Sequence, residues 1–409
     1  MPRRYAAALL IMLASLSRAE ESWTLHVREV VDFVLAQETP QGCIPDAPAG
    51  LRANQDGAME RSLLAVAHGF RTTSRPTYRT ALRDAIKWLA ICMEKNDKFW
   101  AGTWRFAYSS KPPYLALPTS PDGKAQDARG LSSTSALFVY LVAVYTDFTG
   151  DDSLSRSLRP HVHRALDFLL ERNRGPNGLF YRGWYQNPTS GNWELCRRQL
   201  AADQADVYLG LLAGYWLTEQ PRLKLAADKL ERELPRLLYH KNQKAFGTAL
   251  DDAGNLLPPI DEPETCFVQG YLSWVFGPTR ETEKAMEWLR DRLAPDGSFR
   301  KNKTETAYVL PVAGFCLGAS RLGLYPNQLR QARKWLREVA VTSRGAVREY
   351  ADLNAPTRND LAGWVIPAWL SSHPHRFDRI PGRPADPQDQ VPPTQPPPPK
   401  PTTATPTSK

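Results

Sequence analysis

Six segments of this 409-residue chain are apolar on nearly every side, and each follows a segment with a single apolar face. The clearest of the six is residues 199–217, QLAADQADVYLGLLAGYWL, which predicts a helix that other helices must surround. The segment SLRPHVHRALDFLLERN before it has apolar residues at helical spacing and charges on its other face. Each pair therefore predicts one buried helix and one covering helix.

The six apolar segments begin near residues 57, 131, 200, 263, 304 and 359, without a fixed period. Open solenoids normally show a tighter and more regular repeat, so this spacing argues against an extended array. Six buried helices need a complete covering layer, and the six amphipathic partners supply one. The economical arrangement is a closed double ring of about twelve helices in six hairpins.

Local motifs agree with a ring of hairpins. The loops before the apolar segments contain NGLF, AFGT and DGSF, and YTDFTGDDSLSRSLRPHVHRALDFLLERN turns into an amphipathic segment. Together with AADQADVYLGLLAGYWL, these motifs resemble the six-hairpin (α/α)6 toroid of glycoside hydrolases and related sugar enzymes, over roughly residues 22–372. The resemblance implies an all-α (α/α)6 toroid with short β-like loops on one face. It also implies a catalytic aspartate on the helix that contains Asp206.

The two ends of the chain differ from the part between them. Residues 1–19 combine two arginines, a short apolar run and small residues up to Ala19, a pattern typical of a secretory signal peptide. Residues 376–409 are dense in proline and threonine, so we expect a disordered tail, available for association with the cell envelope. We predict a toroid domain over residues 20–375 of a secreted or periplasmic protein without a membrane span.

The formal net charge of +9 is weak evidence for nucleic-acid binding. More than half of this charge lies in the two terminal segments, and the remainder is spread over many helices. We therefore expect no nucleic-acid partner. The five cysteines show no CxxC spacing and fit buried thiols, although one or two pairs could bridge in an oxidising compartment.

Carboxylates stand near the start of every apolar segment. Asp203 and Asp206 lie one turn apart on the same helical face, and Asp206 lies too far inside its helix to be a capping residue. Ionised carboxylates are rarely left in a core without a partner, so Asp206 predicts either an ion pair or a wet pocket. Asp127, Glu264 and Glu60 are candidates for a second catalytic carboxyl group from another helix.

Helix capping explains several of these acids without any function. The helix dipole favours acids at N-termini, and Asp56 before a glycine fits an N-cap. Glu305 and Asp360 follow Asn302 and Thr357 at the spacing of a capping box. For these residues a structural role competes directly with a functional one.

Aromatic and charged side chains occupy the same loops and helix starts. Aromatic rings stack on the apolar faces of sugars, and pockets typically combine apolar walls with a few placed polar groups. We predict that substrate binding uses Trp104, Tyr181, Trp184, Trp193, Arg182, Phe299 and Asp360.

Acids beside aromatic rings favour a carbohydrate cleft, and the resemblance implies a glycoside hydrolase, with inversion of configuration favoured. Such enzymes commonly use one protonated and one ionised carboxyl group. The alternatives are a polysaccharide lyase, in which a base such as Tyr308 abstracts a proton beside a uronate, and a noncatalytic sugar-binding toroid. The expected partner in each case is a poly- or oligosaccharide.

Other chemistries have little support in the sequence. The seven histidines lack HExxH or another metal-ligand spacing, so we expect no metal. The chain has no GxSxG motif, phosphate-binding loop or dinucleotide fingerprint, so we expect no cofactor.

Overall fold

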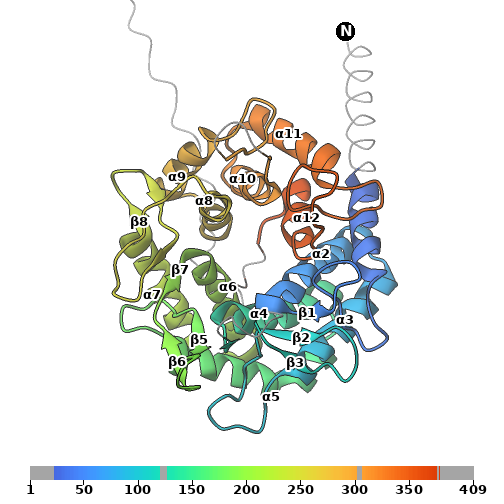
Figure 1. Ribbon diagram of the computed structural model, residues 1–409, viewed down its shortest axis with the longest axis vertical. Coiled ribbons are helices and arrows are strands. Elements are labelled where there is room, and N and C mark those ends of the chain that lie inside the picture. Colours follow the sequence, from blue (N-terminus) through green and yellow to red (C-terminus); the bar gives the residue numbers. More distant parts are fainter. Residues whose placement is uncertain (1–22, 120–126, 302–305, 375–376, 378–409) are drawn as a thin grey trace, which may run out of the picture.

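The computed structural model describes residues 23–119, 127–301, 306–374 and 377. These residues form twelve α-helices in two concentric rings (Figure 1). The prediction of an all-α (α/α)6 toroid is confirmed. The predicted signal peptide and Glu305 lie outside the described residues.

The inner ring consists of six helices that are buried on almost every side. They are α2 (Ala58–Thr73), α4 (Ser132–Thr149), α6 (Ala201–Thr218), α8 (Pro263–Phe276), α10 (Val309–Leu322) and α12 (Ala362–Leu370). Each inner helix packs on the next, and α12 packs on α2. The inner ring is therefore closed, which explains why these sequences lack a polar face.

The outer ring covers the inner one with amphipathic helices. It contains the helix over residues 23–35 and α3 (Pro76–Cys92), α5 (Ser153–Phe168), α7 (Pro221–Leu238), α9 (Arg280–Arg290) and α11 (Pro326–Trp335). On α7 the buried Leu223, Ala227, Leu230 and Leu234 recur at helical spacing. Three outer helices begin with proline, which lacks the N–H that a first helical residue leaves unpaired. Two outer helices continue into short π-helical turns, α5 into Leu169–Asn173 and α11 into Leu336–Ala340.

The connections that lead from an outer helix into an inner one contain small antiparallel sheets. Their strands are β1 (Arg52–Ala53), β2 (Ala107–Ser109), β3 (Ala116–Leu117), β4 (Ala128–Arg129), β5 (Gly183–Gln186), β6 (Trp193–Cys196), β7 (Gln199–Leu200), β8 (Tyr239–His240), β9 (Ala245–Phe246) and β10 (Ala249–Leu250). The sheet orders are β1-β2-β3, β4-β5-β6, β10-β7 and β8-β9. In the longest ladder Gly183 pairs with Cys196 and Gln186 with Trp193.

Packing extends past the boundary that the sequence predicts for the domain. That boundary assigns Phe377 to the tail, but Phe377 is buried against Tyr140 and Trp216. All other residues of the predicted tail, 376 and 378–409, lie outside the described residues. All five cysteines are free. Within the described chain, no helix combines the length and the apolar character needed to cross a bilayer.

The packing of α8 on α10 depends on glycine. A Cβ atom on Gly270 of α8 would lie 2.0 Å from the carbonyl oxygen of Gly314 on α10. Real Cβ atoms do not approach backbone oxygen that closely, so the two helices can pack here only without a side chain.

We expect Gly270→Ala to destabilise the protein, although alanine favours a helix by about 1 kcal/mol over glycine. The backbone clash should lower the free energy of unfolding by about 3 kcal/mol, measured by guanidinium unfolding. Gly254→Ala is the control: its Cβ meets no atom within 4 Å, and only the positive φ is strained. A Gly270→Ala protein as stable as the wild type would contradict this account of the ring.

Candidate active site

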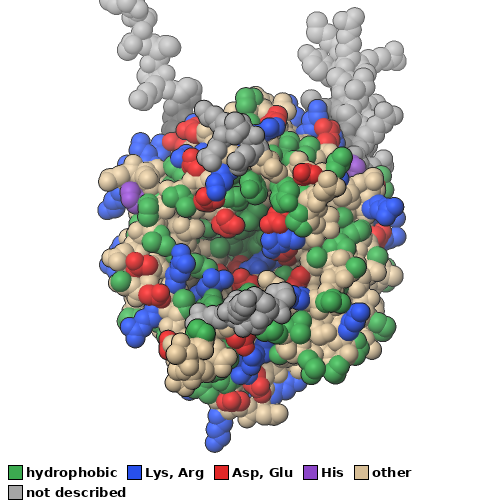
Figure 2. Space-filling view, in the orientation of Figure 1, with side chains coloured by type: hydrophobic (Ala, Val, Ile, Leu, Met, Phe, Trp, Pro, Cys, Tyr) green, Lys and Arg blue, Asp and Glu red, His purple; other side chains and the backbone are tan. Residues whose placement is uncertain are grey.

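A cavity of about 420 Å³ opens at the centre of the inner ring. Its lining comes from α2, α6, α8, α10 and α12 and from the loops that precede these helices. Figure 2 shows the central hollow with acidic, basic and hydrophobic side chains around it. Residues that are distant in the sequence therefore share one pocket, as the toroid interpretation requires.

One wall of the cavity is aromatic. Phe267 and Tyr271 of α8 stack with ring centroids 5.2 Å apart, and Trp364 of α12 lies 4.9 Å from Tyr271. Tyr308 also lines the cavity. Such rings can stack on a sugar while their polar edges fix its orientation.

Asp206 is buried and lines this cavity. The hydroxyl group of Tyr271 donates a 2.5 Å hydrogen bond to its Oδ1, and Arg61 Nη2 lies 3.7 Å from its Oδ2. Burial raises the pKa of Asp206 to about 6, against the opposing effects of the Arg61 charge and the Tyr271 hydrogen bond. The sequence left an ion pair and a wet pocket as alternatives, and Asp206 has both.

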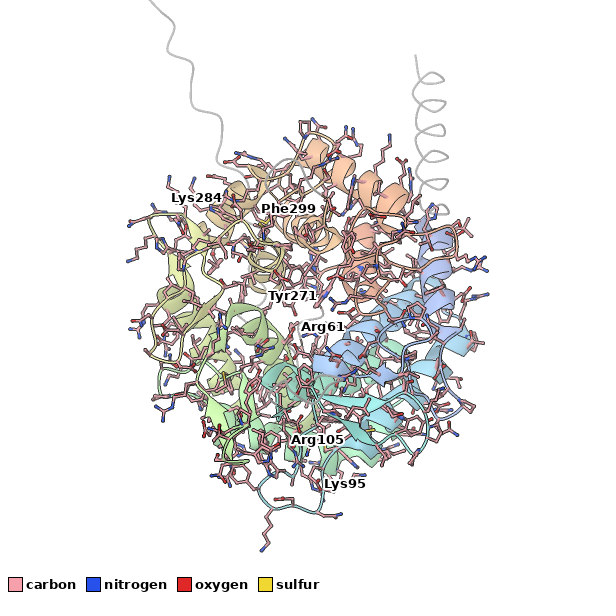
Figure 3. The ribbon with its side chains drawn as sticks, viewed as in Figure 1. Arg61, Lys95, Arg105, Tyr271, Lys284 and Phe299 are labelled. Atoms are coloured by element: carbon pink, nitrogen blue, oxygen red, sulfur yellow. The ribbon has the colours of Figure 1, made fainter. Side chains whose placement is uncertain are left out.

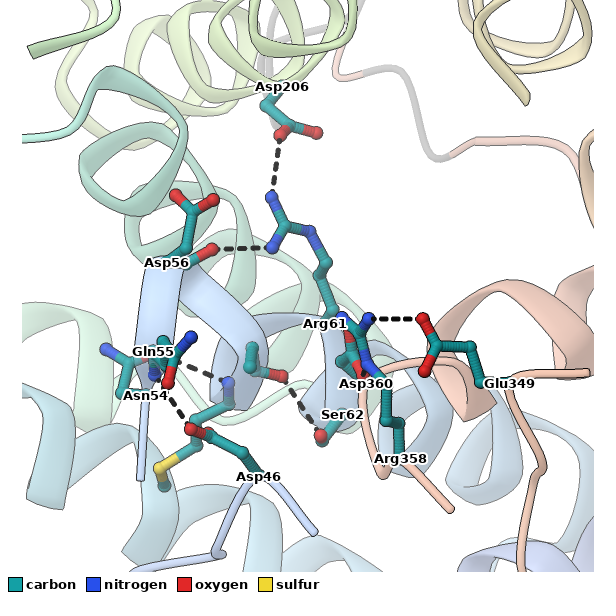
Figure 4. Close-up of polar contacts among 12 residues, drawn as sticks. Asp46, Asn54, Gln55, Asp56, Arg61, Ser62, Asp206, Glu349, Arg358 and Asp360 are labelled. Atoms are coloured by element: carbon teal, nitrogen blue, oxygen red, sulfur yellow. Dashed lines mark hydrogen bonds and ion pairs between the residues drawn. The ribbon is translucent and has the colours of Figure 1, made fainter. Parts of the chain in front are cut away.

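Arg61 connects this carboxylate to the turn before α2. Its Nη1 donates a 2.6 Å hydrogen bond to the backbone carbonyl of Asp56, as Figure 4 shows. Burial lowers the pKa of Arg61, but the charges of the surrounding acids, Asp206 first, raise it by more, so Arg61 stays a cation. Figure 3 shows Arg61 and Tyr271 beside the ring axis.

Asp56 lies in a strained turn at the cavity edge. Its φ of 52° and the φ of 55° at Asn54 are left-handed, which costs about 1 kcal/mol or more per residue. Its Oδ2 lies 3.4 Å from Arg182 Nη2. The N-cap of α2 is Gly57, with no side-chain cap, so the capping interpretation of Asp56 is wrong.

Asp203 is also buried, with 8% of its surface exposed. Burial raises its pKa to about 7, and the charge of Asp56 adds to this effect, while Arg182 and Arg61 oppose it. Two carboxyl groups with raised pKa values thus lie one turn apart on α6, beside a third acid. Such perturbed groups are characteristic of functional sites.

A second ion-paired group closes the cavity near α12. Arg358 donates to Asp360 through Nε at 3.0 Å and Nη2 at 2.7 Å, and its Nη1 lies 3.4 Å from Glu349. The N-cap of α12 is Leu361, without a side-chain cap. The capping-box interpretation of Asp360 is therefore wrong, because its carboxylate pairs with Arg358 instead.

Glu264 lies in the first turn of α8, exposed, and lines the same cavity as Asp206. Within the part of the chain that the structure describes, its carboxylate has neither an ion pair nor a hydrogen bond. Glu264 is therefore the cavity carboxylate most available to a ligand. Of the candidate partners for Asp206 from other helices, it is the one in the cavity lining.

The other two candidate partners lie elsewhere. Asp127 precedes β4 and forms an ion pair with Arg105, away from the cavity lining. Glu60 is fully buried in α2, where Asn54 Nδ2 donates a 3.2 Å hydrogen bond to it. Burial raises its pKa to about 8. The hydrogen bond between Glu60 and Asn54 holds the strained turn that contains Asn54 and Asp56.

Two of the predicted sugar-binding aromatic residues pack against other rings. Trp184 contacts Phe99 and Trp100, and Trp193 contacts Trp100 at 5.2 Å with the guanidinium of Arg105 over its ring. They form an aromatic cluster on the β5–β6 hairpin, outside the cavity lining.

The remaining aromatic candidates have structural contacts. Trp104 is buried and donates its indole N–H to the carbonyl of Leu89, and Phe299 is buried in the core. Tyr181 is half-buried and does not line the cavity, and its backbone carbonyl accepts a hydrogen bond from the Ser132 hydroxyl group. Of the predicted substrate-binding residues, Arg182 and Asp360 are the ones in the lining of this cavity.

The sequence analysis gave no role to several residues that now line the site. They are Arg61, Phe267, Tyr271 and Trp364. A signal existed for two of them, since Phe267 and Tyr271 follow Glu264 at helical spacing on one face. Arg61 is also a cation inside a segment that is otherwise apolar.

No family model matches the chain, and no curated protein sequence matches it. Among solved structures, it is similar to cellobiose 2-epimerase from Spirochaeta thermophila, with a TM-score of 0.65 and 14% identity over 88% of this chain and 96% of that one. It is also similar to the GH76 α-mannanase of Bacteroides thetaiotaomicron, with a TM-score of 0.59 and 11% identity over 85% and 94%.

A third similar structure is a polysaccharide lyase, with a TM-score of 0.56 and 10% identity over 86% of this chain and 96% of that one. These proteins are carbohydrate-active (α/α)6 toroid enzymes of different reaction types. At such low identity the likeness establishes the fold, and the family within the toroid superfamily is not resolved.

We expect Glu60→Gln to change how stability depends on pH. A carboxyl group with a raised pKa binds more protons folded than unfolded, so its contribution to stability falls as pH rises from about 4.5 towards about 8. The amide of glutamine does not ionise, so the variant does not lose stability as pH rises. Its carbonyl oxygen can still accept the hydrogen bond from Asn54 Nδ2. The melting temperature of the variant relative to wild type should therefore rise by about 2–6 °C between pH 5 and pH 9. Glu283→Gln on α9 is the matched control. If the melting-temperature difference between Glu60→Gln and the wild type did not change with pH, the raised pKa of Glu60 would be contradicted.

Proposed function

We propose that this chain is an exported glycoside hydrolase that cleaves a poly- or oligosaccharide in the central cavity, with Asp206 and Glu264 as the proton-transferring groups. The observation that carries the proposal is the Asp206 carboxyl group, which is buried, lines the cavity and has a pKa raised to about 6. General acids in hydrolases are tuned in this way by burial beside aromatic rings.

Asp206 acts as the acid that protonates the leaving oxygen. After proton transfer, Tyr271 and Arg61 stabilise the carboxylate, one by a hydrogen bond and one by its charge. Glu264 acts as the base that activates water, because it is exposed in the same cavity. The aromatic wall of Phe267, Tyr271 and Trp364 supplies a stacking surface for the sugar.

The arrangement of the elements supports this assignment. Asp206 and Glu264 come from α6 and α8, which are neighbouring inner helices that pack on each other. Two carboxyl groups that flank one glycosidic bond are the usual requirement for hydrolysis. The family resemblance favours inversion of configuration. The α-mannanase to which the chain is similar has a hydrolytic activity in its name.

A polysaccharide lyase is the second candidate, and the placement of Tyr308 in the cavity lining with Arg61, Arg182 and Arg198 favours it. A tyrosine could abstract the proton beside a uronate while a guanidinium neutralises the acid group. Elimination creates a double bond that absorbs in the ultraviolet, whereas hydrolysis does not. Product absorbance on uronate polymers therefore separates the two reactions.

We expect Asp206→Asn and Glu264→Gln each to reduce kcat by about 10²–10⁴-fold, measured by release of reducing sugar from the best substrate of a glycan panel. Each change removes a group that moves a proton while it conserves side-chain size. Asp228→Asn, on the outer helix α7, is the matched control and should keep wild-type activity. A folded Asp206→Asn protein with full activity would remove Asp206 from the mechanism.

Tyr271→Phe tests whether Asp206 is the acid or the base. Loss of the hydrogen bond removes an interaction that lowers the pKa of Asp206, so this pKa rises further above about 6. If Asp206 is the acid, the alkaline limb of the pH–rate profile should move up by about one pH unit, because the carboxyl group stays protonated to a higher pH. Movement of the acidic limb instead would assign Asp206 as the base.

A further inference from the structure

The charges around the cavity are unevenly paired. The lining contains four arginines, and three of them contact acids: Arg61 with Asp206, Arg182 with Asp56, and Arg358 with Asp360 and Glu349. The fourth, Arg198, is exposed and lines the same cavity. Among the residues that the structure describes, none forms a hydrogen bond or ion pair with its guanidinium group.

Arg198 lies beside another arginine. The backbone N–H of Arg182 donates a 2.8 Å hydrogen bond to the carbonyl of Arg198, at the end of the β5–β6 hairpin. Both side chains line the cavity, so this hairpin places two cations on one wall. The acid that contacts Arg182 is Asp56, at 3.4 Å, and no acid among the described residues contacts Arg198.

Two guanidinium groups that line one wall of a cavity favour an anionic group in the ligand, most of all where one of them has no acid in contact. The planar fork of arginine also matches the two oxygens of a carboxylate or a sulfate ester. From the unpaired Arg198 beside Arg182, we infer that the cavity selects a saccharide with an anionic group, which Arg198 binds. The inference rests on the proposed function for its sugar ligand and extends it to the substrate class.

Arg198 comes from a different element than Glu264 and the aromatic wall. Arg198 follows β6 and lies before α6, whereas Glu264 and the aromatic wall belong to α8 and α12. A sugar whose ring rests on the aromatic wall can therefore direct a charged substituent towards the hairpin. The paired Arg358 cannot take this role without breaking its two bonds to Asp360.

Binding to a glycan array tests the inference, with Asp206→Asn as the background to prevent turnover. The array includes uronate glycans with their uncharged methyl esters, and sulfated glycans with their desulfated forms. We expect binding of at least one charged glycan with at least tenfold preference over its uncharged form. The arm that binds identifies the anion as carboxylate or sulfate. Calorimetry with that glycan then compares the arginine variants.

Arg198→Gln should weaken this binding at least tenfold, whereas Arg197→Gln should leave it unchanged. Arg197 is the matched control, because it is also exposed and adjacent but does not line the cavity. Equal effects of the two changes, preference for uncharged glycans, or no glycan binding would overturn the inference. Selective binding through Arg198 without any cleavage by the wild type would instead refute the hydrolase proposal alone. If the wild type cleaved neutral glycans and Arg198→Gln cleaved them equally well, the result would refute the anionic site alone.

Discussion

The packing of α12 on α2 is the contact on which the site depends, because it closes the inner ring. A Cβ atom on Gly363 would lie 2.1 Å from the carbonyl oxygen of Arg61, so the two helices meet at the turn that holds this arginine. Closure also places Trp364 beside Tyr271 and brings Asp360 to the cavity. The step that completes the core therefore also assembles residues from both ends of the domain into one pocket.

Closure has an electrostatic consequence. Carboxyl groups that the closed ring buries lose contact with water, and this burial raises the pKa values of Asp203, Asp206 and Glu60. Arg61 limits this effect for the two aspartates, since its charge favours their ionised forms. Buried charges cost stability, and the large apolar core of the double ring tolerates that cost. Groups that hold a proton near neutral pH are thus a result of the architecture.

The sequence predicted the fold because helical periodicity and the alternation of covering and buried segments are local properties. The sequence also predicted an ion pair or a wet pocket at Asp206 from a local property, since capping does not explain an acid deep in an apolar helix. The partners were harder to predict. In the sequence, Tyr271 and Trp364 look like ordinary core aromatic residues. Trp184 and Trp193 look like sugar-binding residues, but Trp184 packs on Phe99 and Trp193 packs on Trp100. Which rings face the cavity depends on how loops fold and on contacts across the closed ring, and neither has a local signature.

The two ion pairs at the cavity differ in geometry, and the difference supports the proposed role of Asp206 over a purely structural one. Arg358 holds Asp360 through two nitrogens, at 3.0 and 2.7 Å, which is the geometry of a fixed pair. Arg61 lies 3.7 Å from Asp206 and gives its shorter hydrogen bond to a backbone carbonyl. Asp206 therefore keeps the capacity to exchange a proton in the cavity while a nearby cation stabilises its charge. A pair built only for stability would resemble the one at Asp360.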